Sequence, residues 1–532
     1  MRLALALLLL SLSPSFSSPP PTFPSITTSL LPSSEPAKPV YACCECPESS
    51  ESPDTCESFA PVEIGALPQM TPAESISQLN LAVAAWDGGM GTWPQLTTEA
   101  RCVAIEQVLV KLMLKRTAMI DALMFEIGKT KADATAEFDR TIVFIRSCIT
   151  LLRDNWGTTS PDLGGTLAYI RRAAVGVILA LGPANYPLNE TYAMVIPALL
   201  TGNTVVMKIP AAGSLVHLLT IDAFTSTLPP GTLTFISGGG RVTCPPVMET
   251  GLVDGLAFIG GSAAADSLIR SHPQPHRLKV FSQLEAKNMA VFLPDDPLED
   301  SLTAALSGAL SYNGQRCTAL KLLYVPVAKR DEFKAKFTNL VHSLPVGMPW
   351  EDTSKITPLP DKKRIDYMLA LLADAKAKGG EIVGGSIIGG PASTLMAPAI
   401  VYGVTEGMRL YSEEQFGPIV AVAFYEDLNE IVRNAKEGIY AQQISLFTAG
   451  TDNGALATIV DKFSKIFGKI NLNAAAGRSP DSLAFSGRRS SAMGTMSVDK
   501  ALEAFTVETV VSAKREHEEI WNDVLARVNF AK

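Results

Sequence analysis

Histidine and surplus positive charge are both scarce in this sequence, and each scarcity excludes a class of function. Five of the 532 residues are histidine, and none stands in a Ser/His/Asp pattern or in a metal-ligand spacing. We therefore expect neither a hydrolase triad nor a metal site. The formal net charge is −8, whereas nucleic-acid binding needs basic surfaces that displace counterions. We accordingly expect no nucleic acid among the partners.

Long apolar runs are missing beyond the N-terminus. No later stretch reaches the roughly 20 unbroken apolar residues of a membrane span, so we expect no span in the mature protein. The GxGxxG fingerprint of many dinucleotide-binding proteins is also absent. A hydrophobic content of 47% and a charged content of 18% are typical of packed globular proteins. Because 532 residues are too many for one ordinary core, we expect two or three domains.

The N-terminus has the composition of a targeting segment. "MRLALALLLLSLS" places one early positive charge before a mostly apolar stretch from Leu3 to Leu12, which is the layout of a secretory signal. A Ser/Pro/Thr-rich stretch follows to about Pro39 and resembles the two-part presequence of algae with complex plastids. We expect entry into the secretory pathway, with such a plastid as a candidate compartment. A protein started at Met70 would remain in the cytosol.

A cysteine cluster, "CCECPESSESPDTCES", follows this leader. Its thiols are those of Cys43, Cys44, Cys46 and Cys56. Residues 1–69 hold two basic and seven acidic residues, a net charge of −5. The cluster contains no histidine and no second spaced Cys pair, so a zinc site or a disulfide set is the weaker alternative. We interpret residues 1–69 as a leader followed by a disordered acidic linker.

From Met70 onward the periodicity predicts an α/β protein. Helical spacing covers residues 72–86, 97–126 and 130–154. Strands at Val175–Leu181, "TVVMKIP", "LTFISGGG" and "GLAFIGG" then alternate with helices near 213–226, 244–250 and 262–271. A second alternating half has strands at "LKLLYVPV", "PIVAVAFY", "QISLFTAG" and "KIFGKINLN", with helices near 329–343, 362–378 and 428–436. The pattern predicts two lobes with parallel sheets and a site between them.

Three consecutive strand ends carry residues suited to a phosphorylated ligand. Lys208 ends one strand, although a lysine there is also compatible with a solvated loop. Gly238, within "SGGG", allows close backbone approach after the next strand. Gly261 and Ser262 precede a helix whose free N–H groups can receive a pyrophosphate. Further along, Cys317 in "SYNGQRCTALKLLYV" reads either as a core cysteine or as a nucleophile at a pocket.

The order of these motifs resembles the aldehyde dehydrogenase superfamily over residues 70 to about 512. The motifs are "LGPANYPLN", "GNTVVMKIP", "FIGGS", "GQRCTALK", "EEQFGPIVAV" and "INLN". The resemblance implies an α/β fold with a Rossmann-type cofactor domain, an α/β catalytic domain and a small β oligomerisation flap. It places the cofactor domain at 70–154 and 174–283, the flap at 155–173 and 496–512, and the catalytic domain at 284–495. Homotetramers or homodimers are implied, and residues 513–532 are expected to form a helical tail.

The resemblance also implies roles for residues around Cys317. Cys317 matches the nucleophile that forms a thiohemiacetal and then a thioester. Asn185 matches the amide of the oxyanion hole. Glu414 and Phe416 match the residues that hold the nicotinamide ribose and ring, and Lys208 matches the lysine at the adenosine ribose.

The cofactor is inferred from the residue three positions after Lys208. NAD-preferring relatives usually carry a glutamate there, which repels a 2′-phosphate. Here the position is Ala211. We therefore expect NADP as the cofactor.

The general base departs from the family pattern. The family's Glu-Leu-Gly-Gly-Lys stretch is replaced by "FSQLEAKNMAVFL", in which ungapped counting puts Gln283 in the glutamate position and Glu285 two residues later. We assign the base role to Glu285; the alternative is that Glu285 is structural and water is activated by another route. Ala184 replaces the aromatic residue that usually precedes the oxyanion asparagine, which suggests a more open pocket wall.

Within the superfamily, the closest resemblance is to the non-phosphorylating, NADP-dependent glyceraldehyde-3-phosphate dehydrogenases. It rests on Arg140, Tyr186, Arg316 and Arg478. Arginines and a tyrosine hydroxyl suit a phosphate dianion because they give charge-assisted bonds to its oxygens. The implied reaction oxidises D-glyceraldehyde 3-phosphate to 3-phosphoglycerate without inorganic phosphate. The alternatives are an NADP-linked dehydrogenase of another aldehyde or semialdehyde, and a catalytically impaired binding or structural member.

Overall fold

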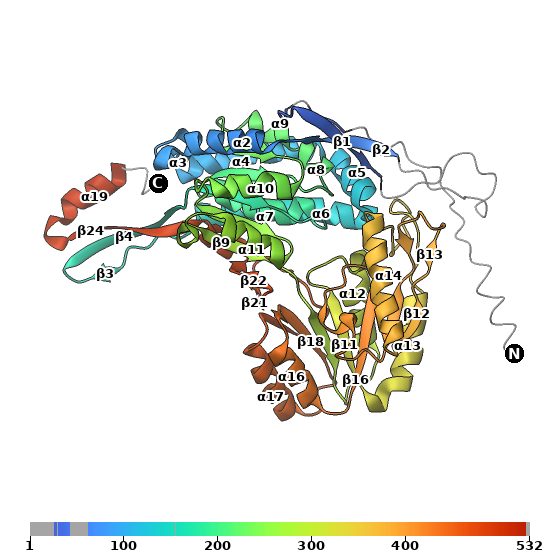
Figure 1. Cartoon of the computed structure of the whole chain (residues 1–532). Helices are drawn as coiled ribbons and strands as arrows, with labels where there is room; N and C mark the ends of the chain where they lie inside the picture. The colour runs from blue at the N-terminus through green and yellow to red at the C-terminus, as the bar shows by residue number, and fades with distance from the viewer. Residues whose placement is uncertain (1–25, 29, 43–61, 155, 528–532) are drawn as a thin grey trace, which may run out of the picture.

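The computed structural model describes residues 26–28, 30–42, 62–154 and 156–527. Within these ranges the chain forms two α/β lobes, a β flap that projects from the first lobe, and an N-terminal hairpin (Figure 1). The first lobe is defined here by a six-stranded sheet with its helices, and the second lobe by a seven-stranded sheet with its helices. The predicted α/β class with two lobes is confirmed.

The sheet of the first lobe has the order β22-β9-β8-β5-β6-β7. Its strands are β5 (Val177–Leu181), β6 (Thr204–Lys208), β7 (Leu233–Ile236), β8 (Gly255–Ile259), β9 (Lys279–Gln283) and β22 (Ala492–Met493). The first five pair in parallel and are almost wholly buried, which explains their continuous apolar runs. The chain passes from β5 to β6 and β7, then returns to β8 and β9, so the topological switch point lies between β5 and β8.

Helices cover both faces of this sheet. They are α2 (Pro72–Trp86), α3 (Thr92–Gln95), α4 (Thr98–Leu114), α5 (Arg116–Ile127), α6 (Lys131–Arg153), α7 (Pro187–Leu200), α8 (Leu215–Leu218), α9 (Ile221–Thr225), α10 (Gly240–Glu249) and α11 (Ser262–Ser271). Most agree with the predicted ranges. The helix expected over 97–126 is divided at Lys115, and the one near 213–226 is divided into α8 and α9.

The sheet of the second lobe has the order β12-β15-β16-β11-β10-β18-β19. Its strands are β10 (Asn288–Phe292), β11 (Leu320–Pro326), β12 (Glu381–Gly384), β15 (Ala399–Tyr402), β16 (Ile419–Tyr425), β18 (Gln443–Phe447) and β19 (Lys469–Leu472). Only the edge strand β12 is antiparallel to its neighbour. The covering helices are α12 (Asp300–Leu310), α13 (Arg330–His342), α14 (Lys362–Ala377), α16 (Leu428–Glu437) and α17 (Asn453–Ser464).

The flap is a three-stranded sheet made of β3 (Asp162–Leu163), β4 (Thr166–Ala174) and β24 (Thr506–Lys514). The predicted pairing of its two segments is present, because β24 lies antiparallel to β4 along its full length. The predicted start at residue 496 is wrong, since Val498–Ala504 forms α18, which packs on α6 and α7. Its role in oligomerisation stays a prediction. In the tail, α19 spans Glu518–Arg527 (Figure 1).

Two further boundaries need correction. Residues 492–493, assigned to the catalytic domain, form β22 and pair with β9 in the first lobe. Part of the expected disordered linker is ordered, because β1 (Glu35–Tyr41) and β2 (Glu63–Gln69) form an antiparallel hairpin. The hairpin is held by apolar burial, since Val40, Ile64 and Leu67 are part of the first lobe's core. Cys43, Cys44, Cys46, Cys56 and the leader residues 1–25 lie outside the described residues.

None of the helices in the described ranges is long and apolar enough to cross a membrane. Within the same residues, no group of three or more His, Cys, Asp or Glu side chains is arranged to hold a metal ion.

Candidate functional site

A cavity of about 890 Å³ lies where the two lobes meet. It opens at the switch point of the first lobe's sheet, because both the segment after β5 and the segment after β8 line it. The predicted site residues that line it are Arg140, Asn185, Tyr186, Gly261, Glu285, Arg316, Cys317, Glu414, Phe416 and Arg478. Ala184 and Gln283 line it as well. Sequence positions from 140 to 478 are thus brought to one cavity.

Other predicted cofactor residues lie outside this cavity. Lys208 ends β6 as expected, but it is buried and its ammonium donates a hydrogen bond to the carbonyl of Ile209. Burial lowers the pKa of this lysine. Ala211 and Gly238 line a second cavity. Ser262 is the first residue of α11, and its backbone N–H points to Glu285.

Cys317 is held in a loop whose backbone is unusual. Tyr312, Asn313 and Gly314 have φ values of 49°, 56° and 70°, so three successive residues adopt the left-handed conformation just before it. The Asn313 side chain fixes this turn by exchanging hydrogen bonds with the backbone of Thr357. The carbonyl of Cys317 accepts a hydrogen bond of 2.7 Å from the Asn288 side chain. Backbone strain held by such contacts is common at functional sites.

The Cys317 thiol is free and half-buried. Burial raises its pKa to about 12, and the carboxylates of Glu190 and Glu414 add to the rise. Arg478 and Lys321 oppose it. Because the thiolate is the nucleophilic form, the thiol needs a base to react. Cys102, Cys148 and Cys244 are fully buried in the core, which separates them from Cys317.

Asn185 and Glu285 line the same cavity as Cys317. The Asn185 amide donates a hydrogen bond of 2.7 Å to the carbonyl of Gln315, which ties the residue after β5 to the Cys317 loop. The Glu285 carboxylate accepts a hydrogen bond of 2.8 Å from the N–H of Ser262. Between the described atoms of Glu285 and Cys317 there is no hydrogen bond. The role of Glu285 as the base stays a prediction, as does the alternative that Glu285 is structural and water is activated by another route. Gln283, in the ungapped glutamate position, ends β9 and is buried.

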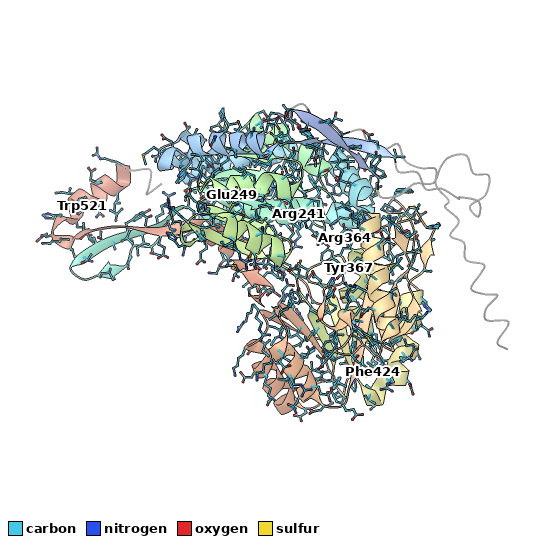
Figure 2. The ribbon with its side chains drawn as sticks, in the orientation of Figure 1. Arg241, Glu249, Arg364, Tyr367, Phe424 and Trp521 are labelled. Carbon is cyan, nitrogen blue, oxygen red and sulfur yellow. The ribbon has the colours of Figure 1, made fainter. Side chains whose placement is uncertain are left out.

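The N-terminus of α11 binds an anionic group in this structure, namely the carboxylate of Glu285. A carboxylate already occupies the N–H that was predicted to receive a pyrophosphate. A methyl group added to Gly261 would lie 3.0 Å from the Glu285 carboxylate, so close approach depends on this glycine. Glu414 and Phe416 line the same cavity, and burial raises the pKa of Glu414 to about 7. Figure 2 shows Arg364 and Tyr367 of α14, which line the same cavity.

Two of the arginines in the Cys317 cavity form ion pairs with carboxylates that were not predicted from the sequence. Arg478 pairs with Glu190 and lies 3.4 Å from Asp481. Arg140 makes a two-point contact with Asp481, with donor–acceptor distances of 2.9 and 2.5 Å. Burial raises the pKa of Asp481, but the bond from Arg140 and the charge of Arg478 hold it below its usual value. Asp481 could have been found from the sequence, because it stands three residues after Arg478. Glu190 could not, because it is 288 residues away from Arg478.

Some donors of these arginines have no acceptor. Arg316 donates to the carbonyls of Ser307 and Gly308, at the end of α12, but its buried Nε has no hydrogen-bond partner among the described residues. The same is true of one terminal nitrogen of Arg478. Buried donors without a partner are costly. Both arginines also line the cavity, where the rest of each guanidinium group is suited to an anionic ligand.

A buried ion pair supports the wall that carries Tyr186. Lys129 and Glu137 are 2.5 Å apart and fully buried. The Lys129 ammonium also lies 3.4 Å from the ring centre of Tyr186 and 4.5 Å from that of Tyr312. Glu137 accepts hydrogen bonds from the first N–H groups of α7, at Leu188 and Asn189. This pair therefore links the segment after Asn185 to the loop before Cys317.

Replacing Glu137 with glutamine is expected to lower the free energy of unfolding by about 3–5 kcal/mol, because Lys129 would stay buried without its counter-charge. Urea unfolding followed by circular dichroism measures this. Asp139→Asn is the control, since Asp139 lies on the same helix and its ion pair with Arg116 of α5 is exposed. Equal losses in both variants would contradict the assignment.

Comparisons with known proteins identify the family. A model of the aldehyde dehydrogenase family matches residues 48–511. The NADP-dependent glyceraldehyde-3-phosphate dehydrogenase of Streptococcus equinus is 31% identical over 451 residues, which are 84% of this chain and 92% of that protein. The protein of the same name from Apium graveolens is 28% identical over 430 residues, which are 79% of this chain and 84% of that one.

Solved structures share the fold. The crystal structure of NADP-dependent glyceraldehyde-3-phosphate dehydrogenase from Bacillus halodurans C-125, complexed with NADP, has a TM-score of 0.79 at 29% identity and covers 90% of this chain and 96% of that one. The match over residues 48–511, the shared fold and the placement of Cys317 lead to one conclusion. The chain belongs to the aldehyde dehydrogenase family.

Proposed function

We propose that this protein oxidises D-glyceraldehyde 3-phosphate irreversibly to 3-phosphoglycerate, with reduction of NADP and without inorganic phosphate. The observation that carries the proposal is the set of arginines that line the cavity of Cys317, namely Arg140, Arg316 and Arg478. An apolar aldehyde would make no use of these guanidinium groups, whereas a phosphate would. The names of the Streptococcus equinus and Bacillus halodurans relatives support the same reaction.

The ion pairs around the proposed phosphate site leave it with little net positive charge. Arg140 and Arg478 are offset by Asp481 and Glu190, so their cluster is close to neutral. Arg316 is not paired with a carboxylate among the described residues, and it therefore supplies the uncompensated positive charge. In this proposal, hydrogen bonds from Arg316, Arg478 and the Tyr186 hydroxyl recognise the phosphate. The net charge of the cavity contributes less than these hydrogen bonds.

The cofactor of the proposed reaction is NADP, and the residues fit it. The N–H of Ser262 already accommodates an anionic oxygen, which is the role that a phosphate of the cofactor would take. Glu414 and Phe416 would hold the nicotinamide end in the Cys317 cavity. When bound, NADP accepts the two electrons of the oxidation as a hydride at its nicotinamide ring.

The chain's own groups then account for the remaining steps. The sulfur of Cys317 forms a bond to the aldehyde carbon after its proton is removed, and the aldehyde oxygen takes up the electron pair. The Asn185 amide stabilises that oxygen. After the oxidation the carbon is bound to sulfur as a thioester. Glu285 takes a proton from water as the water oxygen bonds to this carbon, the carbon–sulfur bond breaks, and Cys317 is released as a thiolate. Glu285 must leave the Ser262 N–H to do so.

Replacing Arg478 with lysine keeps the charge but removes the fork of donors. We expect kcat/KM for glyceraldehyde 3-phosphate to fall by about 10- to 100-fold, as befits the loss of a charge-assisted hydrogen bond. Arg316→Gln should act in the same direction, and it does not disturb the pair with Glu190. Steady-state assays with phosphorylated and unphosphorylated D-glyceraldehyde measure the ratio of the two kcat/KM values. A ratio that both variants leave unchanged would rule out these arginines as the phosphate site.

A further inference from the structure

Glu190 is the one acidic residue of α7, which the structure describes in full, and it lines the cavity of Cys317. Every other residue of α7 is buried, whereas the Glu190 side chain keeps 17% of its surface exposed. It stands in the first turn of the helix, where the helix dipole favours negative charge. Next to burial, the charge of Glu190 is the main cause that raises the pKa of Cys317, so the carboxylate acts on the reacting end of the cavity.

The partner of this carboxylate is Arg478, whose side chain is only 6% exposed. One terminal nitrogen of Arg478 donates to Glu190. The Nε atom lies 3.4 Å from Asp481, and the other terminal nitrogen is buried without a partner among the described residues. The nitrogen bound to Glu190 is therefore the main donor that Arg478 can offer to a ligand in the cavity. A ligand that takes it must displace Glu190.

The two carboxylates beside Arg478 are held to different degrees. Asp481 also accepts two hydrogen bonds from Arg140, at 2.9 and 2.5 Å, so it is anchored from a second side. In the part of the chain that the structure describes, Arg478 is the only residue that donates a hydrogen bond to the Glu190 side chain. Glu190 can therefore leave Arg478 at the cost of one ion pair, whereas Asp481 stays in place.

The charge of the ligand decides whether this exchange is favourable. A carboxylate group carries the same charge as Glu190, so it replaces one ion pair with another of the same kind and gains little. A phosphate monoester carries about two negative charges and has three acceptor oxygens. It can bond to Arg478 and also to Arg316, which lines the same cavity and has no carboxylate partner among the described residues. The second contact offsets the loss of the Glu190 pair.

We propose that Glu190 is a specificity residue that selects phosphorylated aldehydes over aldehydes that carry a carboxylate. In the free protein Glu190 is the counter-ion of Arg478, and it gives up this place only to a dianion. The inference rests on the phosphorylated substrate of the proposed function, and it adds the element that works against a competing substrate. Glu190 acts through Arg478, so it is a positioning residue and not a catalytic one.

The kinetic test compares Glu190→Gln with the wild-type full chain on D-glyceraldehyde 3-phosphate and on succinic semialdehyde. With glutamine, a monoanion no longer has to displace a charge from Arg478. We expect the ratio of kcat/KM for the phosphorylated over the carboxylated aldehyde to fall by about tenfold, mainly through a lower KM for succinic semialdehyde. Glu413→Gln is the matched control, because Glu413 lines the same cavity but pairs with Arg409. A Glu190→Gln ratio equal to that of the control would overturn the proposal.

A binding measurement without turnover separates this inference from the proposed function. Glycerol 3-phosphate and 4-hydroxybutyrate are the alcohol analogues of the two substrates, and each protects Cys317 from iodoacetamide when it occupies the cavity. In wild-type protein without cofactor, half-protection should need at least about tenfold less glycerol 3-phosphate than 4-hydroxybutyrate, and Glu190→Gln should close most of this gap.

The outcomes of the two experiments are distinguishable. Equal protection of the wild type by both compounds, or a variant that keeps the wild-type gap, would overturn the role of Glu190 even if D-glyceraldehyde 3-phosphate is oxidised. The expected gap, and its loss in Glu190→Gln, would support that role even in a protein that does not oxidise D-glyceraldehyde 3-phosphate. In that case only the proposed reaction would be wrong.

Discussion

Replacing Cys317 with alanine is expected to lower kcat for aldehyde oxidation on the order of 10⁴-fold or more, because no covalent intermediate can form without the sulfur. Cys317 is the one cysteine in the described ranges that is not fully buried, and it alone of these lines the cavity between the lobes. The measurement is the initial rate of NADPH formation, beside a Cys244→Ala control in the core. Activity within tenfold of wild type in Cys317→Ala would contradict the role of the thiol.

The pH dependence of Cys317 reactivity follows from its raised pKa. Because burial lifts the pKa of the thiol to about 12, the thiolate is the minor form throughout the neutral range. The rate of alkylation by iodoacetamide should therefore rise about tenfold per pH unit between pH 7 and pH 9. Peptide mapping by mass spectrometry assigns the rate to Cys317 and excludes the N-terminal cysteines. A rate that levels off near pH 7 would mean that the thiol is already ionised.

Replacing Glu285 with glutamine is expected to lower steady-state turnover by about 10²- to 10⁴-fold, the range for a lost general base. A near-isosteric amide can still accept the hydrogen bond from Ser262, but it cannot take a proton from water. If thioester hydrolysis is the step that fails, a rapid burst of one NADPH per active site should remain. Stopped-flow absorbance at 340 nm measures both phases.

The control for Glu285→Gln is Gln283→Met. Gln283 is the residue that ungapped counting places at the position of the family's glutamate. Gln283 is buried at the end of β9, and its amide only approaches the carbonyl of Gly494, at 3.4 Å. We expect this variant to keep its turnover within tenfold of wild type. If Glu285→Gln turns over normally, Glu285 is not the base and water is activated by another route.

The lobes could be predicted from the sequence because their signals are local. Buried parallel strands are short apolar runs, and the helices between them repeat every three to four residues, so the alternation is visible without tertiary information. The family motifs then placed Cys317, Asn185 and Glu414 in one cavity, where the structure has them. The weaker boundaries lie where local signals conflict. α10 begins at glycines that read as a turn and contains two prolines.

The features that could not be predicted depend on distant partners. β1 has the composition of a linker, and it is a strand because β2 pairs with it and the first lobe buries its Val40. The paired state of Arg478 depends on Glu190, which is 288 residues away in sequence. Long-range contacts of this kind are fixed only when the lobes assemble.

The most direct test of the proposed reaction is a coupled product measurement in phosphate-free buffer. Wild-type full-length protein, kept under reducing conditions, is mixed with D-glyceraldehyde 3-phosphate and NADP, and NADPH and 3-phosphoglycerate are both quantified after acid quenching. The proposed mechanism predicts sustained turnover with one 3-phosphoglycerate for each NADPH. Turnover that requires added inorganic phosphate, or that occurs only with unphosphorylated aldehydes, would contradict it.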